Sequence, residues 1–188
     1  MNNHENEMYR RKKGGIHMLT AKQNFLETIK VDGKPDRLVN QYEPFVHIGN
    51  DPLSVYTRGN RVRGKTSVDR WGTTILFPED APGPMPHVTD DLKVCPDVTE
   101  WQKYVKVPDL IGNCSEGWEN ALATAAEVDR DEKLVMGFMG TGIFEQCHFL
   151  MGFEDTLMNF LLEPEAMKDL VATVAEYRFQ YAKLLVDN

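Results

Sequence analysis

The chain has 188 residues, of which 41% are hydrophobic and 27% are charged, and its formal net charge is −8. This balance is typical of a globular domain, and the negative charge disfavours a nucleic-acid-binding protein, which needs a basic face. No run of the sequence approaches the ~20 apolar residues needed to span a bilayer, and no signal-peptide core follows the N-terminal charges. We therefore expect no nucleic-acid partner, no membrane association and a cytoplasmic location.

The cysteines, Cys95, Cys114 and Cys147, are odd in number and widely spaced. They form no CxxC motif, so we expect a reducing compartment, no disulfide framework and no zinc motif made by cysteines alone. Cys147 and His148 are adjacent, and neighbouring positions of a helix or strand point in different directions. Core packing or a hydrogen bond is the ordinary explanation of this pair, and a metal site is the more specific alternative.

Residues 1–17 differ from the rest of the sequence. They are polar, carry the basic run Arg10–Lys13 and lack apolar periodicity, which predicts a disordered or non-native N-terminal extension. Gly14–Gly15 can be encoded by a ribosome-binding sequence shortly before Met18. We therefore expect Met18 to be the natural start and residues 18–188 to form the domain.

The first regular elements follow at once. Thr20 and Gln23 fit a capping box at the start of a helix that ends at Asp32–Gly33. The first strand is expected within Leu38–Ile48, and a short helical stretch begins at Asp51–Pro52.

A basic segment and a hairpin come next. Arg58–Lys65 carries three arginines and a lysine, which is typical either of a solvated loop or of a loop that binds carboxylates through guanidinium groups. Asp69–Phe77 predicts a turn and a strand of a hairpin. Pro78–Pro86 is rich in Pro and Gly, so we expect no regular structure there.

The remaining elements alternate between helices and one strand. Helices are predicted from Asp97 to Gln102 with Thr99 as N-cap, over Ser115–Val128, over Phe153–Leu162, and from Pro164 onward. Leu134–Phe138 reads as a strand of a parallel sheet, and the loop Gly140–Gly142 follows it. Repeated strand–loop–helix units indicate an α/β fold with parallel strands. A TIM barrel needs eight such units and ~250 residues, of which this chain supplies about half.

Three segments resemble the uroporphyrinogen decarboxylase superfamily. The segment LTAKQNFLETIKVDGKPDRLVNQYEPF is similar to its opening helix, turn and first strand. DRWGTTILFPEDAPGPMPHV resembles the Asp-x-Trp-Gly segment of the methyltransferase-like branch, and the sequence from Val135 to Leu185 resembles a mid-chain block with a glycine-marked loop before a helical pair. The resemblance runs from Leu19 to the end and implies the N-terminal portion of a (β/α)8 TIM barrel, incomplete in this chain.

The family holds two chemistries. Its decarboxylases remove carboxylates from pyrrole side chains without a cofactor and carry an arginine-bearing segment after the first strand. The matching stretch here, Asn40–Pro44, lacks both arginines and contains the acidic Glu43, which would repel a polycarboxylate. Its methyltransferases move methyl groups between a corrinoid and a thiol or aryl ether, often with zinc, which activates the thiol.

The resemblance therefore implies zinc and a corrinoid protein for a full-length parent, and no cofactor or metal ligand in this chain. The leading hypothesis is a truncated corrinoid-linked methyltransferase or O-demethylase component that is inactive alone and whose partner is the corrinoid protein or a small-molecule substrate. One alternative is a decarboxylase (lyase) of porphyrin biosynthesis. A second alternative is a non-catalytic module that a partner chain completes, so the sequence leaves open whether the chain is an enzyme.

Barrel active sites lie at the C-terminal ends of the strands, which suggests the candidate residues. The catalytic candidates are Glu43, His47 and Glu145, and the substrate-binding candidates are Tyr42, Asp69, Trp71, Gly140 and Thr141. Strand alternation lets only some of the first group point inward, and ordering of the hairpin is the alternative role of Asp69 and Trp71. The backbone of Gly140–Gly142 can approach a ligand closely, although the loop lacks the spacing of a nucleotide-binding motif.

Overall fold

The computed structural model describes residues 18–40 and 42–188, and the predictions made for residues 1–17 lie outside this part of the chain. Two compact units are present. Unit 1 draws its described residues from Met1–His47 and Ala125–Met136, and unit 2 comprises Ile48–Thr124 and Gly137–Asn188. Each unit is described by itself below.

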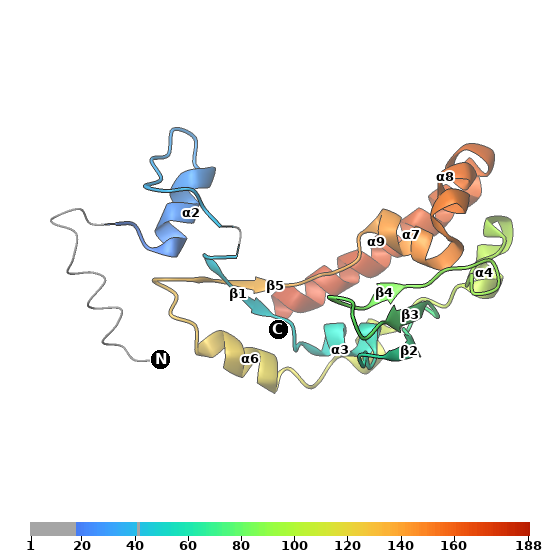
Figure 1. Cartoon of the computed structure of the whole chain (residues 1–188), viewed down its shortest axis with the longest axis horizontal. Coiled ribbons are helices and arrows are strands. Elements are labelled where there is room, and N and C mark those ends of the chain that lie inside the picture. The colour runs from blue at the N-terminus through green and yellow to red at the C-terminus, as the bar shows by residue number, and fades with distance from the viewer. Residues whose placement is uncertain (1–17, 41) are drawn as a thin grey trace. The chain divides into compact units, whose positions relative to one another are not determined.

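The chain is mixed α/β, as expected, but its described residues form no closed barrel. The helices are α2 (Ala21–Ile29), α3 (Pro52–Arg58), α4 (Trp101–Tyr104), α5 (Leu110–Asn113), α6 (Glu119–Ala126), α7 (Ile143–Met151), α8 (Phe153–Leu162) and α9 (Pro164–Asp187), with a 3-10 turn η1 (Val98–Glu100) (Figure 1). The strands are β1 (Phe45–Ile48), β2 (Lys65–Val68), β3 (Thr74–Phe77), β4 (Met85–Pro86) and β5 (Leu134–Gly137). Within the described ranges, no helix has the length and apolarity required to cross a bilayer.

Unit 1 begins with the predicted capping box. The hydroxyl of Thr20 accepts a hydrogen bond from the backbone N–H of Gln23 (3.1 Å), and the Thr20 N–H donates to the Gln23 side chain (3.0 Å). β1 and β5 pair in parallel, which confirms the expected parallel strands. The Phe25 ring of α2 packs edge-on against Phe45 of β1, with 5.0 Å between centroids.

Asn24 connects α2 to the turn that follows it. The side chain is 1% exposed. Its Oδ1 accepts a hydrogen bond from the Asp36 N–H (2.9 Å), and its Nδ2 donates to the Arg37 carbonyl (3.0 Å). A buried amide satisfied in this way fixes the path of the chain, because any replacement leaves backbone groups without partners.

We expect Asn24→Ala to destabilise unit 1 by about 1 kcal/mol, because the Asp36 N–H and the Arg37 carbonyl lose their hydrogen bonds to the buried side chain. Hydrogen exchange of the Asp36 amide measures the effect and should become much faster. Lys30→Ala is the matched control, since it removes only an exposed ion pair with Glu27 and should change little. Equal exchange in the two variants would contradict the role given to Asn24.

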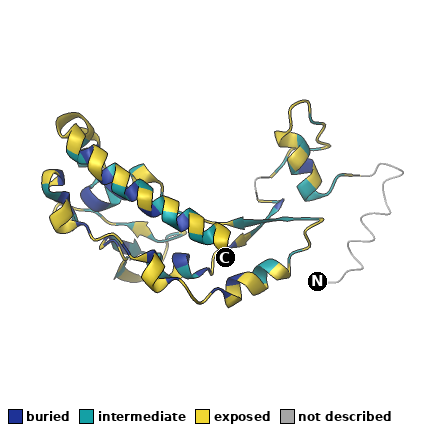
Figure 2. Cartoon of the chain, turned by 180° about the vertical axis from the view of Figure 1, so that it is seen from behind, coloured by how far each residue is buried: buried dark blue, intermediate teal, exposed yellow. Residues whose placement is uncertain are grey.

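Unit 2 has its core around α9. Five of the α9 side chains are buried, namely Met167, Leu170, Val174, Tyr177 and Tyr181. Their spacing of three and four residues places them on one face of the helix, and Figure 2 shows buried and exposed positions alternating along it. α7 and α8 pack against α9, and the fully buried Leu150 and Met151 of α7 join the same core.

The hairpin of unit 2 is also as predicted. β2 and β3 are antiparallel with Lys65 opposite Phe77, and the Asp69 carboxylate caps the connecting turn by accepting from the N–H groups of Trp71 and Thr73, both at 2.9 Å. The expectation of no regular structure up to Pro86 is wrong at its end. Pro86 pairs opposite Ile75 in β4, which proline tolerates because β4 is an edge strand that needs no donor there.

Two helix starts differ from the prediction. The side chain of Asp97, not Thr99, provides the cap, because Asp97 Oδ1 accepts from the Thr99 N–H at 2.9 Å. The helix expected from Ser115 begins only at Glu119. Gly117 has a φ of +87°, which interrupts a right-handed helix at that point.

Candidate functional site

An enclosed cavity of about 30 Å³ lies within unit 2. Its walls come from α3, the segment after α3, the turn between β2 and β3, the loop before α7, α7 itself and α9. Four residues predicted from the sequence line it: Asp69, Trp71, Gly140 and Thr141. The fold therefore brings the hairpin turn and the glycine-marked loop to one place, although they are far apart in sequence.

Arg178 of α9 positions the loop before α7. Its Nη1 donates to the Gly140 carbonyl and its Nη2 donates to the Met139 carbonyl, both at 2.7 Å. A Cβ at Gly140 would lie 2.7 Å from the Phe138 ring and 2.8 Å from Arg58 Nη2, so a larger residue would displace these side chains. The following residue, Thr141, has a φ of +66°, a strained conformation for a β-branched residue.

Two hydroxyl pairs tie α3 to α9 beside the cavity. The Thr57 and Tyr177 hydroxyls lie 2.8 Å apart, and the Ser54 and Tyr181 hydroxyls lie 3.0 Å apart. Burial raises the pKa of Tyr181 to about 12 and also raises the pKa of Tyr177. Both phenols therefore stay protonated at neutral pH and act as hydrogen-bonding groups that fix α3 on α9.

Positive charge dominates the lining. The cavity is bordered by the guanidinium groups of Arg58, Arg61 and Arg178 and by one carboxylate, that of Asp69. Burial lowers the pKa of Arg61, helped by the charge of Arg58, and burial also lowers the pKa of Arg178. Burial raises the pKa of Asp69. Arginine nevertheless stays protonated in proteins, so the cavity carries a net positive charge that water solvates poorly.

Some residues of the basic segment Arg58–Lys65 fit a carboxylate-binding loop, and others fit a solvated loop. Arg58 and Arg61 line the cavity, as a carboxylate-binding loop requires. Arg63 instead donates to the Glu79 carbonyl at 2.9 Å and lies over the Phe77 ring at 4.6 Å. Lys65 belongs to β2 and is exposed.

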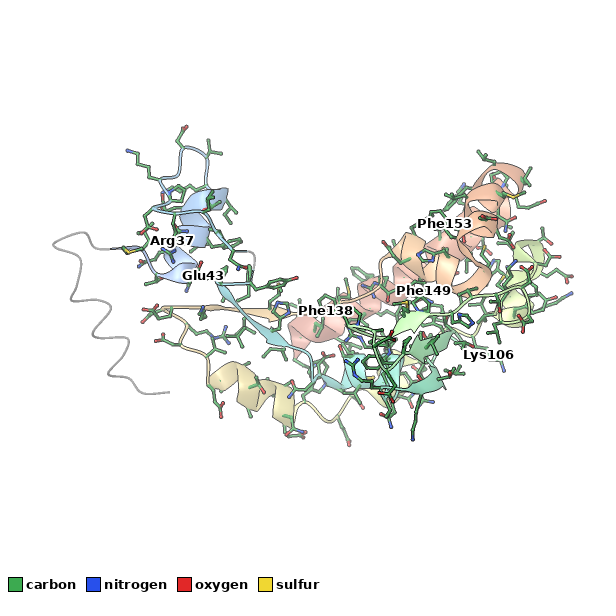
Figure 3. All side chains as sticks on the ribbon, viewed as in Figure 1. Arg37, Glu43, Lys106, Phe138, Phe149 and Phe153 are labelled. Carbon is green, nitrogen blue, oxygen red and sulfur yellow. The ribbon has the colours of Figure 1, made fainter. Side chains whose placement is uncertain are left out.

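The candidates near the first strand lie in unit 1 and not at this cavity. The Glu43 carboxylate forms an ion pair with Arg37 at 2.7 Å (Figure 3), and the Glu43 carbonyl accepts a hydrogen bond from the Lys133 ammonium. Tyr42 is 62% exposed, and its ring lies 5.8 Å from that of the exposed His47. Tyr42, Glu43 and His47 therefore do not line the cavity of unit 2.

Glu145 lies in the first turn of α7 and is exposed. It does not line the cavity, but its charge favours the protonated form of Arg178. Sequence reasoning missed Arg178, Gln146 and Tyr177 as lining residues. The available signal was a cation placed between two tyrosines on the apolar face of α9, and that signal is weak without the tertiary structure.

Cys147 and His148 form no metal site here. Cys147 is fully buried, and burial raises the pKa of its thiol to about 11. The His148 ring packs 4.7 Å from Phe149 and 5.7 Å from Phe153, two rings labelled in Figure 3. No group of three His, Cys, Asp or Glu side chains in the described part of the chain is arranged to hold a metal ion.

Comparisons with known protein families, with curated proteins and with solved structures find no match to this chain. The chain is a mixed α/β protein in which unit 2 encloses a small cationic cavity lined by arginine, tyrosine and a strained glycine-rich loop.

We expect Thr141→Gly to stabilise the protein by about 1 kcal/mol, because glycine adopts a positive φ without strain. Thr124→Gly makes the same change inside helix α6 and is the control. It should destabilise the protein by about 1 kcal/mol. Urea unfolding of both variants measures the two signs. Destabilisation by Thr141→Gly would show that the threonine side chain is itself required for folding.

The three thiols should be unreactive in the native protein. Burial raises the pKa of Cys95, Cys114 and Cys147 to about 11 each. At a pH well below its pKa, a thiol carries almost no thiolate, which is the reactive form. A chromogenic disulfide reagent at about pH 8 should label none in the folded chain and all three in denaturant. A fast native reaction would contradict the burial of that cysteine.

Proposed function

We propose that the chain is a component of a uroporphyrinogen decarboxylase superfamily protein of the methyltransferase or O-demethylase branch, and that it binds its small-molecule substrate at the cavity of unit 2. One observation carries the proposal. Asp69 and Trp71 come from the Asp-x-Trp-Gly segment, and Gly140 and Thr141 come from the glycine-marked loop, and these two features of the family resemblance line one cavity.

The sheet of unit 1 supports the barrel part of this proposal. β1 and β5 are parallel, and each is followed by a loop and a helix. Neighbouring parallel strands with helical crossovers are the building unit of a (β/α)8 barrel. A partial barrel of this kind would place ligands at the C-terminal ends of its strands, and the loop that follows β5 contributes Gly140 and Thr141 to the cavity.

The residues of this chain would act by binding and by positioning. Arg178 holds the loop of Gly140 and Thr141, while the buried Trp71 ring closes the wall beside Tyr177, 4.9 Å away. These groups exclude water and fix the orientation of a ligand. The zinc and corrinoid protein implied by the resemblance belong to the proposed parent protein. The described residues do not fit zinc, because no three His, Cys, Asp or Glu side chains among them are grouped to hold a metal ion.

Decarboxylation of a porphyrinogen is less well supported. The cavity, at about 30 Å³, takes roughly two water-sized groups, so it receives only one small group of any substrate and does not separate the two chemistries. The stretch Asn40–Pro44 lacks the two arginines of the decarboxylases, although Arg37 offsets the charge of Glu43. The methyltransferase branch therefore remains the preferred proposal.

The binding part of the proposal is tested by adding an aryl methyl ether to the full chain. We expect the amide resonances of Gly140 and Thr141 to shift, because both residues line the cavity. The amides of Tyr42 and His47 are the internal control and should stay in place. Shifts at Tyr42 and His47 alone would move the substrate site to unit 1 and contradict the proposal.

The catalytic part is tested with a corrinoid protein, zinc and a thiol acceptor. We expect no methyl transfer by this chain, because its described residues supply no metal-ligand set. The change of the corrinoid absorption spectrum measures methyl transfer. Sustained turnover would overturn the inference that the chain is inactive alone.

A further inference from the structure

The cavity of unit 2 contains hydrogen-bond donors that lack acceptors. Arg61 Nε, Trp71 Nε1 and Gln146 Nε2 are buried and have no hydrogen-bond partner in the part of the chain that the structure describes. All three residues line the cavity. Trp71 and Gln146 are only 2% and 5% exposed, and the Trp71 N–H interacts with the Tyr177 hydroxyl without the geometry of a full hydrogen bond.

Unpaired buried donors are costly, and native proteins avoid them unless a ligand or water supplies the acceptor. The three donors belong to residues that line one cavity, and every fully buried atom without a partner among the described lining residues is a donor. The fourth unpaired atom, Asp51 Oδ2, does not line the cavity. The missing partner is therefore a group that accepts hydrogen bonds.

Charge distinguishes an anion from a neutral acceptor. Three guanidinium groups and the single carboxylate of Asp69 line the cavity, which leaves a net charge of 3 − 1 = +2. The exposed Glu145 near Arg178 reduces the field but does not reverse it. Asp69 Oδ1 accepts from the N–H groups of Trp71 and Thr73, and none of the three free donors has a hydrogen bond to this carboxylate.

The size of the space selects the kind of anion. A volume of about 30 Å³ takes roughly two water-sized groups, which matches the two oxygens of a carboxylate. A planar carboxylate matches the geometry of a guanidinium donor. A tetrahedral anion is larger and fits so small a space less well. We propose that this cavity binds the carboxylate group of the substrate, with Arg61, Trp71 and Gln146 as hydrogen-bond donors. The inference rests on the proposed function, since it names the substrate class of the same site.

The indole N–H resonances of the three tryptophans provide the test in the unmodified chain. Trp101 Nε1 already donates to Asp169 at 3.1 Å and Trp118 Nε1 to the Cys114 carbonyl at 3.0 Å. Acetate should therefore shift the Trp71 indole resonance downfield in a saturable way and leave the other two in place. Acetamide, which is neutral and of similar shape, should bind at least about tenfold more weakly.

Variants of the basic segment separate the site from general charge effects. Arg61→Gln should weaken acetate binding at least about tenfold, because it removes both a cation and a free donor. Arg63→Gln removes the same charge from the same segment, but Arg63 is bound to the Glu79 carbonyl away from the cavity. It should leave acetate binding unchanged. Equal loss in both variants would overturn the proposal.

The outcomes also separate this inference from the proposed function. If acetamide shifts the Trp71 indole as well as acetate does, or if inorganic phosphate binds more tightly than acetate, the carboxylate assignment is wrong while the ligand site stands. If acetate shifts nothing but an aryl methyl ether still shifts Gly140 and Thr141, only the carboxylate assignment falls. If no ligand shifts any cavity residue, both proposals fall. Should Arg61→Gln fail to fold, the tryptophan measurement on the unmodified chain decides alone.

Discussion

The half-buried guanidinium group of Arg178 is the constraint on which the cavity of unit 2 depends. A charge in a poorly solvated position must be satisfied by neighbouring groups, and Arg178 meets this need with the carbonyls of Met139 and Gly140. Those two bonds fix the loop after β5 against α9. The absence of a side chain at Gly140 and the strained φ of Thr141 follow from that position, because the loop must pass close to Phe138 and Arg58.

The tyrosines on either side of Arg178 extend the same constraint to α3. Tyr177 and Tyr181 each place a hydroxyl against a hydroxyl of α3, so the helix that carries Arg58 is held at a defined distance from the helix that carries Arg178. Burial keeps both phenols protonated, and their bonds therefore persist at neutral pH. The positive charges of Arg58 and Arg178 repel each other, and these bonds keep both side chains at the border of one cavity.

Features encoded within a few residues were predictable from the sequence, and features that depend on distant packing were not. The capping box of Thr20 and Gln23 formed as expected because both partners lie in one turn. The ion pair of Glu43 with Arg37 could not be predicted, because it depends on how the chain folds back on itself. The sequence pointed to the hairpin and to the glycine loop separately, but their meeting with Arg178 at one cavity requires α9, whose sequence pattern indicates only an amphipathic helix.

Arg61 and Arg63 show why a local charge count does not define a binding site. They are two residues apart in one basic segment. Arg63 donates to the Glu79 and Ala81 carbonyls and lies over the Phe77 ring, whereas Arg61 keeps a buried donor without a partner. The overall charge of −8 conceals this difference, since a field inside a low-dielectric cavity is set by the nearest groups. An acidic protein can therefore hold a site that selects anions, because the surrounding negative charge lies in solvent, where it is screened.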